Sequence, residues 1–153
     1  MKKLSLLIII LVATCTVALA QPRAIGLRLA WGIGASYQHS IGEKNMIQVD
    51  LDFPAYYAGI QATATYNWVF PISSWSGSGS WNWYAGVGLG AGYMMAFYKF
   101  EVANTWKNVF AVDAIAGVNF LDMIDLSYTI KVKPDFKHLM VSHKLSVGYV
   151  YRF

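Results

Sequence analysis

The residues of this sequence that could take part in chemistry are mostly charged side chains set between apolar neighbours. Arg28, for example, stands between Leu27 and Leu29. Charges withdrawn from water are stable only when they are paired, and both signs are present here. We therefore predict an internal ion-pair network with these members: Arg28, Asp50, Asp52, Asp113, Lys131, Lys144 and Arg152.

The histidines are the candidates for acid–base catalysis, and there are three: His39, His138 and His143. His143 follows Ser142 directly, and successive side chains of a strand face opposite sides, so this pair cannot act as base and nucleophile. We interpret His143 as an interfacial residue near the outer rim. A lipid-modifying enzyme that uses His143 with a serine on a neighbouring strand is kept as an alternative.

Metal and cofactor sites have weak support. Cys15 is the only cysteine, and scattered histidines give no ligand spacing. The glycine-rich run 86–92 lacks the ending of a phosphate loop and lies in a strand pattern. We expect no catalytic residue, no metal and no cofactor.

The first residues predict a secretory signal peptide. Lys2 and Lys3 precede an apolar core at 6–13, and the small residues Ala18 and Ala20 precede Gln21. We expect a signal peptide at 1–20 and one domain at 21–153. Acylation of Cys15 at a lipoprotein-like site is a less favoured alternative.

The composition excludes several classes of protein. Of the 153 residues, 56% are hydrophobic and only 13% are charged, whereas soluble domains carry about 25% charged residues. The predicted domain has no apolar run of 18 residues, which excludes a helical membrane span. It also has no Lys/Arg cluster, so we expect no nucleic-acid partner. A transmembrane β-barrel is rich in apolar residues and needs no long apolar run, because its strands are only half apolar.

Alternation along the chain predicts the strands of this barrel. Odd-numbered positions from Leu139 to Phe153 are apolar or aromatic except His143, whereas even-numbered positions are mostly polar or small. Eight segments alternate and are predicted to form an all-β, antiparallel up-and-down barrel: 24–31, 35–40, 45–53, 56–70, 81–97, 108–120, 124–132 and 139–153. Both termini then lie on the periplasmic side, and short external loops are expected near 32–34, 54–55, 98–107 and 133–138.

The apolar face is predicted to point outward, because the few strand charges cannot coat a soluble surface. A secreted lipocalin-like barrel, with apolar residues inside, is the alternative. Aromatic residues near strand ends favour a membrane, since they suit the headgroup zone. We predict an aromatic girdle from these residues: Trp31, Phe53, Trp68, Trp81, Trp83, Phe97, Phe120 and Tyr151.

The end of the chain carries a resemblance. Tyr149, Tyr151 and a terminal Phe153 are similar to the signal that the barrel assembly machinery reads. The chain resembles the small eight-stranded outer-membrane barrels, which include OmpX-like proteins and the OmpA transmembrane domain. This resemblance implies folding through the periplasm into the outer membrane of a diderm bacterium, with membrane lipid and the assembly machinery as partners. The short expected loops depart from the family and put adhesion in doubt.

The function expected from these features is a structural or interaction role in the envelope, as a monomer. An eight-stranded barrel is only wide enough for side chains to fill it, so ion pairs should plug the lumen. The main alternative is a small pore or conduit for ions or hydrophobic solutes. In that case the glycine stripe at 86, 88, 90 and 92 would leave a small wet cavity.

Overall fold

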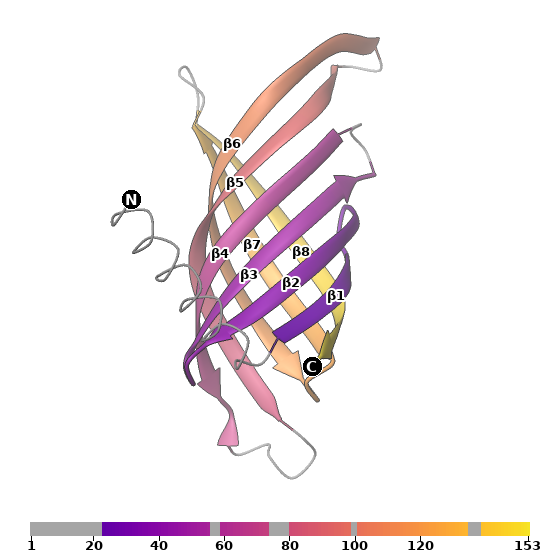
Figure 1. Ribbon diagram of the computed structural model, residues 1–153. Helices are drawn as coiled ribbons and strands as arrows, with labels where there is room; N and C mark the ends of the chain where they lie inside the picture. The colour runs from indigo at the N-terminus through magenta and orange to yellow at the C-terminus, as the bar shows by residue number, and fades with distance from the viewer. Residues whose placement is uncertain (1–22, 56–58, 74–79, 99–100, 135–138) are drawn as a thin grey trace, which may run out of the picture.

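Eight antiparallel strands close into one barrel in the computed structural model, as the alternation predicts (Figure 1). The structure describes residues 23–55, 59–73, 80–98, 101–134 and 139–153. Within these ranges, only the backbone is described for 94–107 and 134–140. The predicted signal peptide lies outside these residues. The strands are β1 (Arg23–Leu29), β2 (Gly32–Ile41), β3 (Asn45–Pro54), β4 (Gly59–Pro71), β5 (Trp81–Tyr98), β6 (Glu101–Phe120), β7 (Ile124–Pro134) and β8 (Leu139–Arg152).

The barrel closes where β1 meets β8. Ala24 lies opposite Arg152, and Leu29 lies opposite Val147. Backbone hydrogen bonds join Arg23 and Phe153 in both directions, at 3.2 and 2.8 Å. The first and last strands therefore meet at one end, which we call the terminal end (Figure 1). The opposite end, where the β1–β2 turn meets the end of β3, is called the mouth.

The apolar side chains point outward and the polar ones inward, as predicted. Leu27, Leu89 and Phe110 are 66–69% exposed, whereas Asn67 and Asp113 are fully buried. Buried residues are mostly polar or charged, which is the reverse of a soluble barrel. No helix among the residues placed here is long and apolar enough to cross a membrane.

The loop predicted at 98–107 is wrong for most of its length. β5 continues to Tyr98, and β6 begins at Glu101. Phe97 lies opposite Val102 after a register shift near Met95. The backbone hydrogen bonds between two paired strands do not depend on side-chain polarity, so polar residues there do not end the strands. β5 and β6 therefore extend beyond the other strands at the mouth (Figure 1).

The loop predicted at 32–34 is also wrong, because β2 begins at Gly32 and the turn lies at 30–31. A Cβ at Gly34 would lie 2.6 Å from Oδ1 of Asp52, and one at Gly32 would meet the carbonyl oxygen of Phe53. Glycine in a strand often marks such a close approach. The loops predicted near 54–55 and 133–138 start later than expected, because β3 continues to Pro54 and β7 continues to Pro134. Residues 135–138 lie outside the residues described.

The glycine stripe of β5 packs against β4. A Cβ at Gly86 would meet Asn67, and one at Gly88 would meet Ala64 and Thr65. At Gly92 the nearest atom would be the carbonyl oxygen of Ile60, at 2.9 Å. The stripe therefore permits close contact with β4.

Candidate functional site

The middle of the lumen is occupied by Arg28, which is buried and reaches two carboxylates on other strands. Its Nη1 lies 3.0 Å from Oδ2 of Asp50, and its Nη2 lies 2.8 Å from Oδ1 of Asp125. Nη2 also donates to the hydroxyl of Ser127. One guanidinium from β1 therefore links β3 and β7 across the barrel interior.

Uncharged side chains donate further hydrogen bonds to the two carboxylates. Tyr84 donates its hydroxyl to both oxygens of Asp125, at 2.9 and 3.1 Å. Gln48 donates Nε2 to both oxygens of Asp50, and Ser36 donates its hydroxyl to Oδ1 at 2.6 Å. These bonds offset the second negative charge, since hydrogen bonds to an ionised group are strong. We call Arg28, Asp50, Asp125, Tyr84 and Gln48 the central cluster.

The ring of Tyr84 fills the space that Gly117 leaves on β6. Tyr84 and Gly117 lie opposite each other in the β5–β6 pairing. A Cβ at Gly117 would come within 2.5 Å of the tyrosine hydroxyl. The small residue on β6 therefore allows a large one on β5 to extend toward Asp125.

A second group of charges lies nearer the mouth. Nζ of Lys131 donates to the hydroxyl of Thr63 at 2.9 Å and to Oδ2 of Asp113 at 3.3 Å. These residues come from β7, β4 and β6, and all three are buried. This pair is separate from the central cluster.

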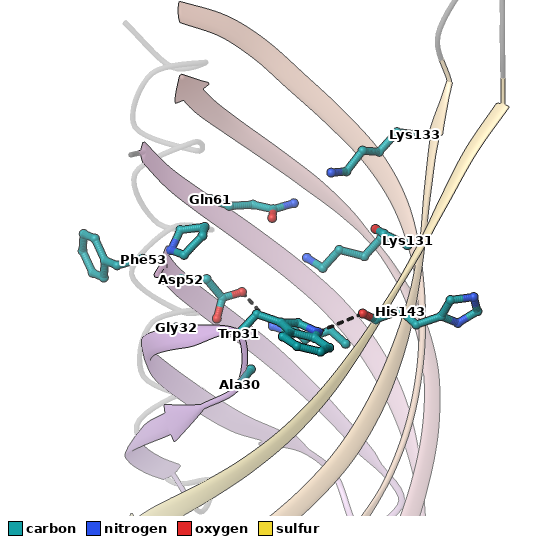
Figure 2. Close-up of a pocket in the computed structure, with 12 residues that line it drawn as sticks. Ala30, Trp31, Gly32, Asp52, Phe53, Gln61, Lys131, Lys133 and His143 are labelled. Carbon is teal, nitrogen blue, oxygen red and sulfur yellow. Dashed lines mark hydrogen bonds and ion pairs between the residues drawn. The ribbon is translucent and has the colours of Figure 1, made fainter. Parts of the chain in front are cut away.

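The third pair stands in the mouth itself. Nζ of Lys144 lies 2.7 Å from Oδ2 of Asp52, with side chains 11% and 14% exposed. Both line a cavity of about 370 Å³, which we call the mouth cavity. Figure 2 shows Gln61 entering this cavity from one wall, with Lys131 and Lys133 entering from the other.

The terminal end has a cavity of its own, of about 480 Å³. Arg152 lines it, and its Nε lies 3.6 Å from Asp122 in the β6–β7 turn, with both side chains partly exposed. Six of the seven residues predicted for the network therefore lie in the lumen as three separate pairings. Arg152 lies at the rim, away from them.

The predicted girdle residues divide between the two ends. Trp31 and Phe53 lie at the mouth and are exposed. The others with described side chains lie near the terminal end, where Trp81 contacts Phe120 at 5.1 Å between ring centroids. The side chain of Phe97 lies outside the described residues. The remaining members at the terminal end are Trp68, Trp83 and Tyr151, and all three are exposed.

A polar pair lies on the outer face of β7 and β8. Nδ1 of His143 lies 2.6 Å from the hydroxyl of Tyr128. Ser142 and His143 both border the mouth cavity, but successive side chains of a strand face opposite sides, and the ring of His143 points away from the cavity (Figure 2). In the part of the chain that is described, no three His, Cys, Asp or Glu side chains gather as metal ligands.

The last residues form an exposed aromatic stripe on β8. Tyr149, Tyr151 and Phe153 point outward, and the rings of Tyr151 and Phe153 stack at 6.4 Å. This places the predicted assembly signal on the outer wall at the terminal end.

Sequence reasoning missed three members of the central cluster, which are Asp125, Tyr84 and the uncharged Gln48. Asp125 alternates with Ser127 and Lys131 on the polar face of β7, so periodicity places it inside, but its partner depends on strand stagger. Tyr84 shares a face with the glycines of β5, which could have marked it as a long side chain with room opposite.

Three solved structures are similar to this chain. Neisserial surface protein A (NspA) has a TM-score of 0.50 and 12% identity, covering 87% of this chain and 94% of that one. The N-terminal barrel domain of Pseudomonas aeruginosa OprF has a TM-score of 0.49 and 8% identity, covering 86% and 96%. Yersinia pestis outer membrane protein Ail has 0.47 and 13%, covering 86% and 99%.

No family model matches this sequence, and no curated protein matches it either. At such low identity the likeness to NspA shows the fold alone. The chain has the fold of the small eight-stranded outer-membrane barrels, as the resemblance predicted.

Proposed function

We propose that this protein is a closed structural barrel of the bacterial outer membrane, with a lumen blocked by its own side chains. The central cluster carries this proposal. Arg28, Asp50 and Tyr84 come from three different strands, and each is at most 3% exposed. Their mutual bonds and those of Asp125 tie together β1, β3, β5 and β7 across the lumen. An interior tied in this way stiffens the wall and leaves little room for a solute.

The outer wall supports a location in lipid. Nearly all of the outward side chains are apolar or aromatic, and a wall of that kind is stable in a bilayer. Aromatic residues at both ends suit the two headgroup zones. We assign the terminal end to the periplasm and the mouth to the outside. Residues 1–20 would direct export, and Tyr149, Tyr151 and Phe153 would be read by the assembly machinery.

Membrane fractionation with gel mobility before and after boiling tests this location. We expect the protein in the outer-membrane fraction, with a boiled form that migrates differently from the folded barrel. Protein found only in the soluble periplasmic fraction would contradict the proposal.

A charge on the outer wall gives a second test. Leu145→Arg should cost about 2–4 kcal/mol in free energy of unfolding if residue 145 faces the bilayer midplane. Leu121→Arg, in the exposed β6–β7 turn, is the matched control and should cost much less. Equal effects would show that residue 145 does not face lipid.

A gated pore is the second candidate function, and one observation favours it. Cavities of about 370 and 480 Å³ lie at the two ends of the lumen, with the central cluster between them. Movement of that cluster would join them into a path. We rank the gated pore below the closed barrel, because such a movement would break several hydrogen bonds and ion pairs of Arg28 and Asp125. We propose no catalytic role for His143.

A further inference from the structure

The mouth cavity has the donors of an anion site. Three lysines and one aspartate line it, and Asp52 is already bound to Lys144. Lys131 is held by Asp113, which leaves Lys133 as the cation in excess. Within the ranges whose side chains are described, no carboxylate forms an ion pair with Lys133. It is half-buried, and its side chain extends into the cavity (Figure 2).

Gln61 supplies an independent sign of a ligand. It is 7% exposed, and its Nε2 is buried with no acceptor among the side chains and backbone described. A buried donor left unsatisfied costs free energy, so such a group in a cavity indicates an acceptor supplied from outside. Gln61 projects from β4 toward β7, which carries Lys131 and Lys133 (Figure 2).

The chemistry of these donors fits a phosphate group. Lysine binds phosphate as a point charge with three donors, whereas planar carboxylates are best matched by arginine, which this cavity lacks. Its volume of about 370 Å³ falls within the ~300–1,000 Å³ typical of small-molecule pockets. There is room for a phosphate and part of the molecule that carries it.

The wall of the barrel extends less far toward the mouth at β1, beside this cavity. β1 ends at Leu29, opposite Val147, whereas β8 begins at Leu139. Residues 139–146 of β8 therefore pass beyond β1 and pair along one edge only, with β7, in the part of the chain described. The indole Nε1 of Trp31 donates to the carbonyl oxygen of His143 across this notch, at 3.2 Å. Trp31 and Phe53 are exposed on the outer wall and also line the cavity, which therefore extends to the side that faces lipid as well as to the mouth.

We propose that the mouth cavity binds a phosphate group through Lys133, Lys131 and Gln61. The phosphate comes either from a solute outside the cell or from the phosphorylated headgroup of a lipid in the outer leaflet. Entry through the notch rests on the proposed outer-membrane location. The binding of free phosphate does not, so the two proposals fail separately.

The test measures two ligands against the folded protein in a glycosidic detergent that contains no phosphate. Calorimetry follows inorganic phosphate, and native mass spectrometry follows lipid A with its phosphates and lipid A without them. Binding of inorganic phosphate assigns a solute site. Selective binding of phosphorylated lipid A assigns a headgroup site. Absence of both, or equal binding of lipid A without phosphate, would overturn the proposal.

Variants locate the site. Lys133→Gln and Gln61→Leu should each weaken binding roughly tenfold, the effect of losing one hydrogen bond to a charged group. Lys44→Gln is the matched control, since Lys44 is an exposed lysine in the turn at the terminal end. Gln61→Leu replaces an unsatisfied donor with an apolar group of similar size, so the barrel should fold, as unboiled gel mobility will verify. Unchanged affinity in either variant would overturn this assignment of the site.

Discussion

The middle of the lumen and its mouth both pair a cation with aspartate, but in different arrangements. In the middle, Arg28 contacts two carboxylates and is 2% exposed, and those carboxylates also accept hydrogen bonds from donors on β2, β3 and β5. At the mouth, Lys144 meets Asp52 alone, and both side chains keep some contact with solvent. Burial, the number of partners and the type of cation separate the two regions.

The choice of cation accounts for much of this difference. The guanidinium is a rigid fork that bridges two acceptors at fixed geometry, whereas the lysine ammonium is strongly hydrated on a flexible stem. Arg28 therefore suits a permanent crosslink in a dry interior. The lysines of the mouth suit a place where water or an anion exchanges with the solvent. In the proposed function, the middle maintains closure and the mouth binds a ligand.

Replacement of Arg28 should show the largest effect. Arg28→Leu leaves Asp50 and Asp125 buried without their cation, and we expect a loss of roughly 3–5 kcal/mol in free energy of unfolding. Urea titration followed by gel mobility measures it. Lys144→Leu is the matched control at the mouth and should cost much less. Equal losses would remove the distinction between the two regions.

The tyrosine hydroxyl should show the next largest effect. Tyr84→Phe keeps the ring beside Gly117 but removes the donor to Asp125, at a cost of about 1.5–3 kcal/mol. The same urea titration applies. Tyr151→Phe removes a hydroxyl from an exposed tyrosine on the outer wall and is the control. A Tyr84→Phe barrel as stable as wild type would mean that neutral donors are unimportant to the cluster.

The mouth pair should show the smallest effect. Lys144→Gln removes one cation from a partly solvated pair, and we expect a loss of about 1 kcal/mol or less. The difference from wild type should shrink further at high salt, because solvent ions screen such pairs. If the loss approached that of Arg28→Leu, the mouth would have to be described as part of the plug.

The strands were predictable because one physical rule covers each of them. Side chains alternate between the outward and inward faces of each strand, and the outward face is apolar in nearly every strand. Arg28 and Lys131 were therefore placed inside correctly. The 98–107 segment escaped this rule, because a ribbon extending beyond the barrel has no need to alternate. The loop predicted at 32–34 was wrong, because Gly32 and Gly34 lie within β2 and admit a neighbouring strand.

The pairing of the charges was less predictable than their direction. Arg28 and Asp125 are 97 positions apart, and only the stagger of the strands brings them to one level. Arg152 shares the inward face of β8 but stands near its end, so it meets Asp122 in a turn. Alternation tells which way a side chain points, and the level along the barrel axis decides its partner.

Planar-bilayer recording of the purified protein tests the closed lumen most directly. A plugged lumen should give no steady conductance in the wild-type protein. Channels should appear when Arg28→Ser is combined with Asp50→Asn and Asp125→Asn, a variant that removes the crosslink without leaving charges unpaired. Steady open channels in the wild-type protein would show that the lumen is not plugged.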